Sequence, residues 1–473
     1  MKSKITTYNL LIFLSLLFSF YSKLEEGSIY LPLTSNFTIE QYKNRVYNKN
    51  YYTITLKIGN PPEEYELQLD TSTSTSWISS NRCKNCILAR RLYDPEDSRT
   101  SSPTDKFLKI EDEDGDVEGY QAADDFTLGT YKLKQFSFVE VTKLADNFMD
   151  HHQGKLGLGY GNYFLKNEEF NFLERLTKNS LIKKKIFTIS TINDKKGMLF
   201  IGDVPGKEYK TFCNVTETAE LDDTYKESWV CEMSHVGIFD KEKGMYKKIK
   251  MYEELKNNKL VSFDSAYDYI AVPISEKEVI ENILSKANLE CKSSKKTNNM
   301  KLSNDLRHRI REEEMTITCK TTNEELKNKN MAISFLLQDF AYSLPLENLF
   351  VESEKKGRMD MLIKYIDDEN AIWTLGYPFF EQFLMVFNME DKHVGMKKLK
   401  KTALPIVDVF DKYTIKEEKT STAFKVFGYF LLILVVLAIL FFVYHAIRKN
   451  GINSKSGLIN IFFLKKILLF NKK

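Results

Sequence analysis

The chain has 473 residues, of which 43% are apolar and 28% are charged, and its formal net charge at neutral pH is +3. This length and apolar content are enough for two domains of ordinary size. Because the net charge is close to zero, and because no dense basic stripe with interleaved aromatic residues occurs in the part expected to fold, we expect no nucleic-acid partner.

The first 22 residues have the pattern of a secretory signal peptide. Lys2 and Lys4 precede the apolar run LLIFLSLLFSF, residues 10–20, and a basic start followed by such a run is typical of a signal. An N-terminal membrane anchor is the alternative, but the run is short for a span. Residues 23–50 then form a short N-terminal or pro segment, in which IYLPL predicts an edge strand entering the first lobe.

Two stretches share an uncommon arrangement. In YELQLDTSTSTSW, residues 65–77, alternating apolar residues predict a half-buried strand that ends on Asp70 and is followed by small hydroxyl residues. The stretch LVSFDSAYDYIAVP, residues 260–273, repeats this pattern: an apolar strand ends on an acid, Asp264, which a hydroxyl residue follows. A carboxylate at the end of a buried strand is costly to ionise unless hydrogen bonds hold it, and the hydroxyl residues after the first acid can supply them.

A second pair of matching segments follows the two acids. GKLGLGY (154–160) lies downstream of the first acid, and WTLGYP (373–378) lies downstream of the second. The order acid–hydroxyl–small, then apolar–apolar–Gly, therefore occurs twice, and such a long-period repeat indicates a duplicated lobe. Two lobes that each present one carboxylate predict a site built from two acids at a shared cleft.

Further local patterns predict hairpins and one insertion. Residues 109–129, KIEDEDGDVEGYQAADDFTLG, predict a β-hairpin with a tight turn near Asp114-Gly115, and by itself this acidic hairpin is typical of a solvated surface turn. Residues 186–203 predict a hairpin of two apolar strands around a charged turn, and Trp229 begins the second lobe. The charged segment between residues 291 and 319 is expected to be an exposed insertion, because charge runs are usually solvated.

The chain has six cysteines, and an even number in a secreted chain indicates disulfides, although six cysteines allow about fifteen connectivities. The CKNC motif could instead serve redox chemistry or bind zinc. We expect neither, and no metal, because the motif lacks a βαβ context and a second ligand pair at zinc spacing. Sequence proximity suggests the pairs Cys83–Cys86, Cys213–Cys231 and Cys291–Cys319.

The C-terminal part has the pattern of a single membrane span. Residues 426–447 contain no Asp, Glu, Lys or Arg, and at ~1.5 Å per residue they can cross a ~30 Å hydrocarbon core. Residues 448–473 carry seven Lys or Arg and no acid, so the positive-inside rule predicts a cytosolic tail and a lumenal or extracellular ectodomain. Asn36 and Asn214 begin glycosylation sequons that suit this location, although such triplets also arise by chance.

Residues 51–398 resemble the pepsin family of aspartic proteases. The entry segment YYTITLKIGNPPEEYELQLDTSTSTSW, residues 51–77, is similar to the family's opening, with its Ile-Gly-x-Pro-Pro turn and a Trp seven residues after the acid. YDPEDSRT (93–100) resembles the aromatic-Asx-Pro-x-x-Ser-x-Thr segment, and IWTLGYPFFEQFLMVFNMEDKHVGM (372–396) resembles the near-terminal pattern.

The resemblance implies a two-carboxylate site and assigns roles around it. Two acids close enough to share a proton activate water without metal, cofactor or covalent intermediate. The first and third cysteine pairs then resemble loop disulfides of the family. The implied roles are catalytic for Asp70 and Asp264, supporting for Thr71, Thr73 and Ser265, with Thr73 able to bond the outer oxygen of Asp70, and substrate-flap for Asp112, Asp114, Gly115 and Asp116.

The residues around the two acids and in the flap differ from the family's pattern at several positions. Ser72 and Ala266 stand where the family has glycine, so both loops are expected to be shifted or strained. Asp112 stands where the flap has a Tyr, and Tyr267 replaces a Thr or Ser beside the second acid. Asp268 adds a carboxylate there, which either perturbs the pair or faces solvent.

Three functions therefore stay open. The favoured one is a monomeric, membrane-anchored aspartic endopeptidase acting on peptides or proteins at acid to mildly acid pH. The second is a catalytically inactive relative that binds peptides or has a structural role, and the third is a single-pass receptor that reuses the fold. The predicted fold is all-β and bilobal with one C-terminal transmembrane helix, divided into 1–22 signal, 23–50 N-terminal segment, 51–208 N-terminal lobe, 209–400 C-terminal lobe, 401–425 linker, 426–447 membrane helix and 448–473 tail.

Overall fold

The structure is a computed structural model that describes residues 28–399 with gaps, together with residues 407–408. The predicted signal, membrane helix and tail lie outside the described residues, and among the described residues no helix is long and apolar enough to cross a bilayer. The gaps are at residues 43–44, 87–90, 113–114, 146–152, 162–167, 194–195, 206–208, 210, 217–220, 243–244, 256–258, 296–313, 354 and 369.

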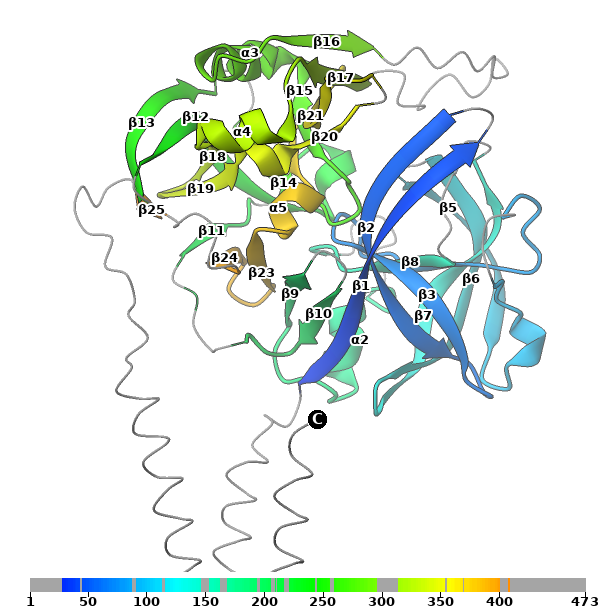
Figure 1. Cartoon of the computed structure of the whole chain (residues 1–473). Coiled ribbons are helices and arrows are strands. Elements are labelled where there is room, and N and C mark those ends of the chain that lie inside the picture. Colours follow the sequence, from blue (N-terminus) through cyan, green and yellow to red (C-terminus); the bar gives the residue numbers. More distant parts are fainter. Residues whose placement is uncertain are drawn as a thin grey trace, which may run out of the picture. The chain divides into compact units, whose positions relative to one another are not determined.

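In the described part of the chain, thirteen strands form one sheet in the order β11-β24-β23-β9-β10-β1-β2-β3-β8-β4-β7-β6-β5, with an additional pairing of β2 and β6 (Figure 1). Short α2 (Phe172–Lys178) packs beside it, with Phe172 edge-on to Phe136. The strands are β1 (Ile29–Tyr42), β2 (Arg45–Ile58), β3 (Glu63–Asp70), β4 (Trp77–Ser79), β5 (Ser102–Asp112), β6 (Gly115–Leu128), β7 (Tyr131–Leu144), β8 (Gly154–Gly157), β9 (Ile186–Asn193), β10 (Lys196–Ile201), β11 (Thr211–Asn214), β23 (Phe383–Asn388) and β24 (His393–Lys398).

The remaining twelve described strands form a second sheet in the order β16-β17-β21-β15-β22-β14-β12-β18-β19-β25, with β13 beside β12 and β20 beside β21. In Figure 1 its green and yellow strands form a group separate from the blue and cyan ones. Its elements are β12 (Trp229–Glu242), β13 (Met245–Glu254), β14 (Leu260–Phe263), β15 (Ile270–Pro273), β16 (Cys291–Lys295), β17 (Glu314–Cys319), β18 (Met331–Leu337), β19 (Phe340–Pro345), β20 (Phe350–Glu352), β21 (Met359–Ile366), β22 (Trp373–Leu375), β25 (Val407–Asp408), α3 (Lys277–Lys286), α4 (Asn323–Lys329) and α5 (Tyr377–Phe380).

The two halves of the chain share the first sheet. Strand β23 comes from the C-terminal half, yet it pairs with β9 of the N-terminal half, while β24 joins the same sheet by pairing with β23 and β11. Phe187 and Phe387 lie opposite each other in this ladder, with their rings stacked at 4.6 Å. Strand pairing therefore runs across the lobe boundary expected at residues 208 and 209.

The strand expected at the edge of the first lobe lies inside the sheet. Its IYLPL residues begin β1, which pairs with β10 and then with β2, so β1 lies between two neighbours in the sheet instead of at its edge. The predicted hairpins at residues 109–129 and 186–203 are present as β5–β6 and β9–β10.

The predicted repeat is visible as two copies of one arrangement. Strand β3 runs parallel to β8, with Asp70 opposite Gly157, and β14 runs parallel to β22, with Phe263 opposite Leu375. In each copy the second strand also pairs antiparallel with the strand after the acid, β4 or β15. Strand β3 was predicted to be half-buried, but its end is buried on both faces, because Gln68 lies against the second acid loop and its Nε2 donates to the Ala266 carbonyl at 3.5 Å.

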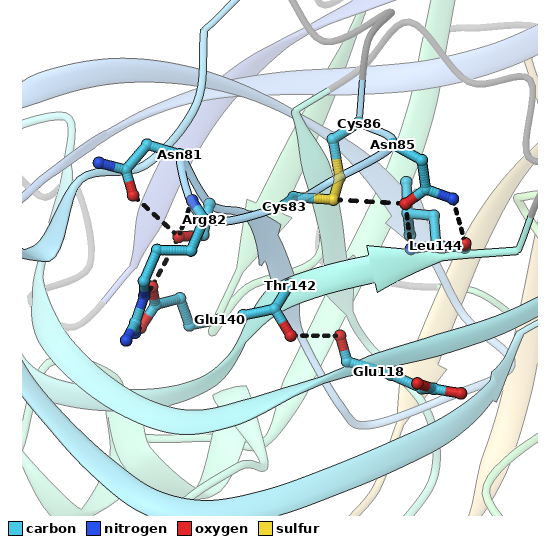
Figure 2. The surroundings of a disulfide bond; sticks show 10 residues. Asn81, Arg82, Cys83, Asn85, Cys86, Glu118, Glu140, Thr142 and Leu144 are labelled. Atoms are coloured by element: carbon cyan, nitrogen blue, oxygen red, sulfur yellow. Dashed lines mark hydrogen bonds and ion pairs between the residues drawn. A yellow bond between two sulfur atoms is a disulfide. The ribbon is translucent and has the colours of Figure 1, made fainter.

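All six cysteines form disulfides, in the pairs suggested by sequence proximity. Figure 2 shows how the first one is held in its loop: the Leu144 N–H donates to Asn85 Oδ1 at 2.9 Å, and the Asn85 amide donates back to the Leu144 carbonyl. Arg82 forms an ion pair with the fully buried Glu140 in the same view. The CKNC motif is thus a structural loop fastened to β7.

Candidate active site

The first acid loop follows β3 and turns Asp70 inward. Asp70 is 2% exposed, and its Oδ1 accepts from the Ser72 backbone N–H at 2.8 Å and from the Ser72 hydroxyl at 2.6 Å. Hydrogen bonds of this kind offset the cost of burying a carboxylate. The residue that replaces glycine therefore adds a donor to the acid.

The second acid loop follows β14 and has the same basic geometry. Asp264 is 3% exposed, and its Oδ1 accepts from the Ala266 N–H at 2.8 Å, which matches the Ser72 bond in length. Neither Ser72 nor Ala266 is among the described residues with positive φ. Neither residue therefore has the left-handed backbone conformation that favours glycine.

Hydroxyl groups fasten the two loops to each other. Thr71 Oγ1 donates to the Phe263 carbonyl at 2.8 Å and accepts from the Ser265 N–H at 3.0 Å. Ser265 Oγ donates to the Leu69 carbonyl at 2.8 Å, and both hydroxyl residues are fully buried. Each loop thus braces the strand end of the other, and the braces bring the Asp70 and Asp264 loops together.

A glycine supports each loop from below at very close range. A Cβ at Gly157 would lie 2.6 Å from the Ser74 carbonyl carbon, and a Cβ at Gly376 would lie 2.2 Å from the Tyr269 oxygen. Contacts this short are possible only for a residue without a side chain. The repeated apolar–Gly signal therefore marks the two places where backbone packs directly on an acid loop.

The structure contradicts the role expected for Thr73. Its hydroxyl donates to Glu227 Oε2 at 3.1 Å and accepts from the Thr75 N–H at 3.1 Å, so it turns away from Asp70. The reason is Glu227, a fully buried carboxylate that also accepts from the Ser74 N–H and hydroxyl at 2.9 and 2.8 Å. Ser72 supplies to Asp70 the hydroxyl bond that Thr73 was expected to provide.

The β5–β6 hairpin reaches this region through Asp112, the last residue of β5. Asp112 lies opposite Gly115 in the ladder, while Asp114, the other residue of the expected turn, lies outside the described residues. Asp116 forms an ion pair with Lys109 at 2.7 Å on the outer part of the hairpin. The Asp112 side chain instead points toward Trp77 at the end of the first acid loop, where its Oδ2 accepts from Trp77 Nε1 at 3.4 Å.

A lysine completes the contact between hairpin and acid loop. Lys155 on β8 is fully buried, and its Nζ lies 2.9 Å from Asp112 Oδ1 and 3.5 Å from Asp70 Oδ2. Sequence reasoning missed both Lys155 and Glu227. The signal for Lys155 was available, because a lysine between glycines in a buried run is costly unless a carboxylate faces it.

A tyrosine stands near the second acid. Burial raises the pKa of Tyr225 to about 12, and the carboxylates of Asp368, Asp222 and Asp264 add to the shift, while a hydrogen bond from the Ile372 N–H at 3.3 Å opposes it. Tyr225 is therefore a neutral phenol at physiological pH. No group of His, Cys, Asp or Glu residues that could hold a metal ion occurs among the described residues.

Two cross-braced acid loops on a duplicated β arrangement define the pepsin-like class of fold. The model of the family described as "Eukaryotic aspartyl protease" matches residues 51–399, which is most of the chain. The chain belongs to this family, and the mostly-β fold with bilobal sheets agrees with it.

Curated proteins of this kind align with parts of the chain. Pregnancy-associated glycoprotein 1 of Sus scrofa is 29% identical over 38% of this chain and 46% of its own length. Procardosin-A of Cynara cardunculus is 33% identical over 22% of this chain and 21% of its own length. Pepsin II-2/3 of Oryctolagus cuniculus is 24% identical over 44% and 54%. The chain thus spans about half the length, or less, of these curated relatives.

Proposed function

We propose that the chain is an aspartic endopeptidase whose catalytic pair is Asp70 and Asp264. The observation that carries the proposal is the reciprocal brace, in which Thr71 and Ser265 tie the two buried acid loops together. A merely structural acid at a strand end needs no partner loop of matching geometry. Two such loops fastened to each other suit a pair of carboxylates that acts as one unit.

The mechanism that fits this pair needs one ionised and one protonated carboxyl group. Like charges at short range do not ionise together easily, so the pair holds a shared proton over a range of pH. The ionised carboxylate removes a proton from a water molecule as the water attacks the scissile carbonyl. The protonated partner donates a hydrogen bond to the carbonyl oxygen and later helps to protonate the leaving amine.

Supporting groups then determine how well the pair is oriented. The Ser72 and Ala266 N–H groups fix one oxygen of each acid, and the proposal assigns the second oxygen of each acid to water and substrate. The β5–β6 hairpin is the proposed flap, with Asp112, Gly115 and Asp116 in its described part. An extended peptide would lie beneath it, held by backbone hydrogen bonds with side-chain pockets on either side.

The proposal places this activity in the lumen of the secretory pathway or outside the cell, on a single-pass membrane protein. Support comes from the uncharged segment 426–447 and the basic tail 448–473, together with the signal pattern of the first 22 residues. Three disulfides and no free cysteine suit an oxidising compartment. Asn214 is exposed on β11, as a glycosylation site requires, and Asn36 lies on β1. We propose a monomer that acts on peptide or protein substrates.

A specific observation also favours a second candidate, an inactive relative that binds peptides. Lys155 and Asp112 bring two additional charges to the acid pair, and Lys155 Nζ lies 3.5 Å from the oxygen of Asp70 that would otherwise face water. In this alternative the ammonium competes with the catalytic water for that oxygen. The cleft would then hold a peptide without turnover.

Cleavage of a mixed peptide library by the full-length chain in detergent, followed by mass spectrometry from acid to neutral pH, separates the two candidates. The endopeptidase proposal expects cuts that vanish in the Asp70→Ala variant. The endopeptidase proposal is contradicted if a folded, disulfide-bonded sample cuts no peptide at any pH. If this sample, immobilised on a column, still retains library peptides, the result supports the inactive relative.

A further inference from the structure

One buried positive charge joins the proposed flap to the acid pair. Lys155 is fully buried, Asp112 is 2% exposed at its side chain, and the two form an ion pair at 2.9 Å. Asp70 Oδ2 lies 3.5 Å from the same ammonium. One cation therefore lies between two carboxylates that come from different elements, β5 and β3.

The strand pairing explains why the lysine cannot turn away. Lys155 is opposite Gln68 on β3 and opposite Trp77 on β4, and pairing on both edges of β8 fixes the face of the sheet from which its side chain projects. Trp77 also donates its indole N–H to Asp112, which orients the carboxylate toward the lysine. A buried ammonium is stable only when carboxylates and hydrogen bonds compensate its charge.

We infer that Lys155 is a positioning residue that fixes the turn end of the flap beside Asp70 and makes Asp70, rather than Asp264, the ionised member of the pair. This inference rests on the proposed function and extends it by assigning the two acids unequal roles. Asp70 would be the group that removes the proton from water, and Asp264 would be the group that donates to the substrate carbonyl. No chemical step passes through Lys155 itself.

The charges around Lys155 predict the direction in which the pH profile of cleavage should move in each variant. Two carboxylates set against Lys155 are Asp112 from β5 and Asp70 from β3, and Asp264 stands on the loop braced to Asp70. Removing the lysine leaves Asp112 as a like charge near Asp70, which disfavours ionisation of the pair. Neutralising Asp112 instead leaves the lysine with Asp70 as its charged partner, which favours ionisation.

The test compares full-length Lys155→Met, Asp112→Asn and the double variant, using a peptide that the wild type cleaves. We expect the acid limb of log(kcat/KM) against pH to move up by about one pH unit in Lys155→Met and down in Asp112→Asn. The double variant, which removes both charges, should lie between the two single variants. At the acid edge of the wild-type profile, Lys155→Met should therefore be about tenfold slower.

A purely structural role predicts a different result. All three variants would then lose rate by a constant factor at every pH, with no displacement of the acid limb, and that outcome overturns the inference. The inference is also overturned if the acid limb of the pH profile moves in the same direction in Lys155→Met and Asp112→Asn. Asp112→Asn keeps the shape of the side chain and one acceptor oxygen, for Lys155 or for Trp77, so it tests the sign even if Lys155→Met does not fold.

A stability measurement keeps this inference distinct from the proposed function. Melting temperatures at neutral pH are compared for Lys155→Met in the wild-type and Asp70→Asn backgrounds, which forms a double-mutant cycle. If the lysine interacts with Asp70, its loss should lower Tm less in the Asp70→Asn background. Equal Tm losses contradict the inference, whereas a wild type without peptidase activity contradicts the proposed function alone.

Discussion

The two acid loops have the same bracing but differ in the polar groups around the acid. In both loops a backbone N–H donates to the acid at 2.8 Å, and each loop rests on a glycine. Ser72 adds a hydroxyl to Asp70, whereas Ala266 brings only a methyl group to the matching place beside Asp264. The shared features are those that position a carboxylate, and the differing features are those that distinguish one carboxylate from its partner.

A second difference lies behind the loops. Glu227 precedes β12 and accepts three hydrogen bonds from Thr73 and Ser74, and Ser228 donates to the Ser72 carbonyl at 3.1 Å. The first loop is therefore fastened to the start of the other half of the chain. This link adds to the brace with the second acid loop, so the first loop is held to the C-terminal half at two places.

The largest expected effect comes from adding a methyl group beneath either loop. Gly376→Ala places Cβ 2.2 Å from the Tyr269 oxygen, and Gly157→Ala places it 2.6 Å from the Ser74 carbonyl carbon. Each should lower the free energy of unfolding by about 3 kcal/mol through overpacking and reduce kcat about a hundredfold through displacement of the acid. Chemical denaturation measures the free energy of unfolding, and peptide cleavage measures kcat.

The control for these two variants is Gly357→Ala, where no atom lies within 4 Å of the added Cβ and a φ of +73° is expected to cost about 1 kcal/mol. An equal loss in this control would refute the packing argument.

Removal of the braces should cost less and should be unequal. Thr71→Val leaves both the Phe263 carbonyl and the Ser265 N–H without this partner, whereas Ser265→Ala removes one bond, to Leu69. With about 1–3 kcal/mol for each buried group left unsatisfied, Thr71→Val should be the more destabilising in urea titrations. Thr104→Val, at an exposed hydrogen bond, should change stability by about 0.5 kcal/mol or less. Equal losses in both brace variants would mean that the two hydroxyls have equivalent roles.

Exchanging the residues in the glycine positions tests the difference between the loops directly. Ser72→Ala removes the hydroxyl bond to Asp70 and makes the first loop resemble the second. A hydrogen bond to a charged group contributes about 1.5–3 kcal/mol, so kcat/KM should fall at least about tenfold. Ala266→Ser, the reciprocal change, should not restore activity in the Ser72→Ala background, because it adds its donor to the other acid. Full rescue in the double variant would show that the two acids are interchangeable.

The smallest expected effect concerns a residue outside both loops. Burial lowers the pKa of His393 from 6.5, with Asp391 opposing the shift. The unfolded chain then binds the proton first as pH falls, so this contribution to stability is complete above about pH 6.5 and is lost as pH falls toward the lowered pKa. Because the ring is partly exposed, the loss should be well under about 1 kcal/mol. In His393→Gln the difference in unfolding free energy between pH 7.5 and 5.5 should be smaller than in the wild type; a larger difference would contradict the sign.

The acid strands, the hairpins and the disulfides could be predicted because each depends on residues close in sequence. The alternation that ends on Asp70 and the second pattern that ends on Asp264 defined both the repeat and the site. The sharing of one sheet by β9 and β23 could not be predicted in this way, because its ladder joins residues about two hundred positions apart.

The errors at the site have a similar origin. Six consecutive hydroxyl residues follow Asp70, and sequence alone could not show that the hydroxyl of Ser72 faces the acid while that of Thr73 faces Glu227. Lys155 received no role from the sequence, because its partner Asp112 lies on a hairpin some forty residues earlier. Local pattern located the acids, but nonlocal contacts determine the charges around them.

The measurement that tests the central claim most directly is the cleavage rate of the wild type, Asp70→Asn, Asp264→Asn and the double variant on one peptide at the wild-type pH optimum. If the two braced acids act as one unit, each single variant should lose activity by at least about a hundredfold, and the double variant should be no slower than the worse single variant. A single variant that retains near wild-type cleavage, or losses that multiply in the double variant, would contradict a shared catalytic pair.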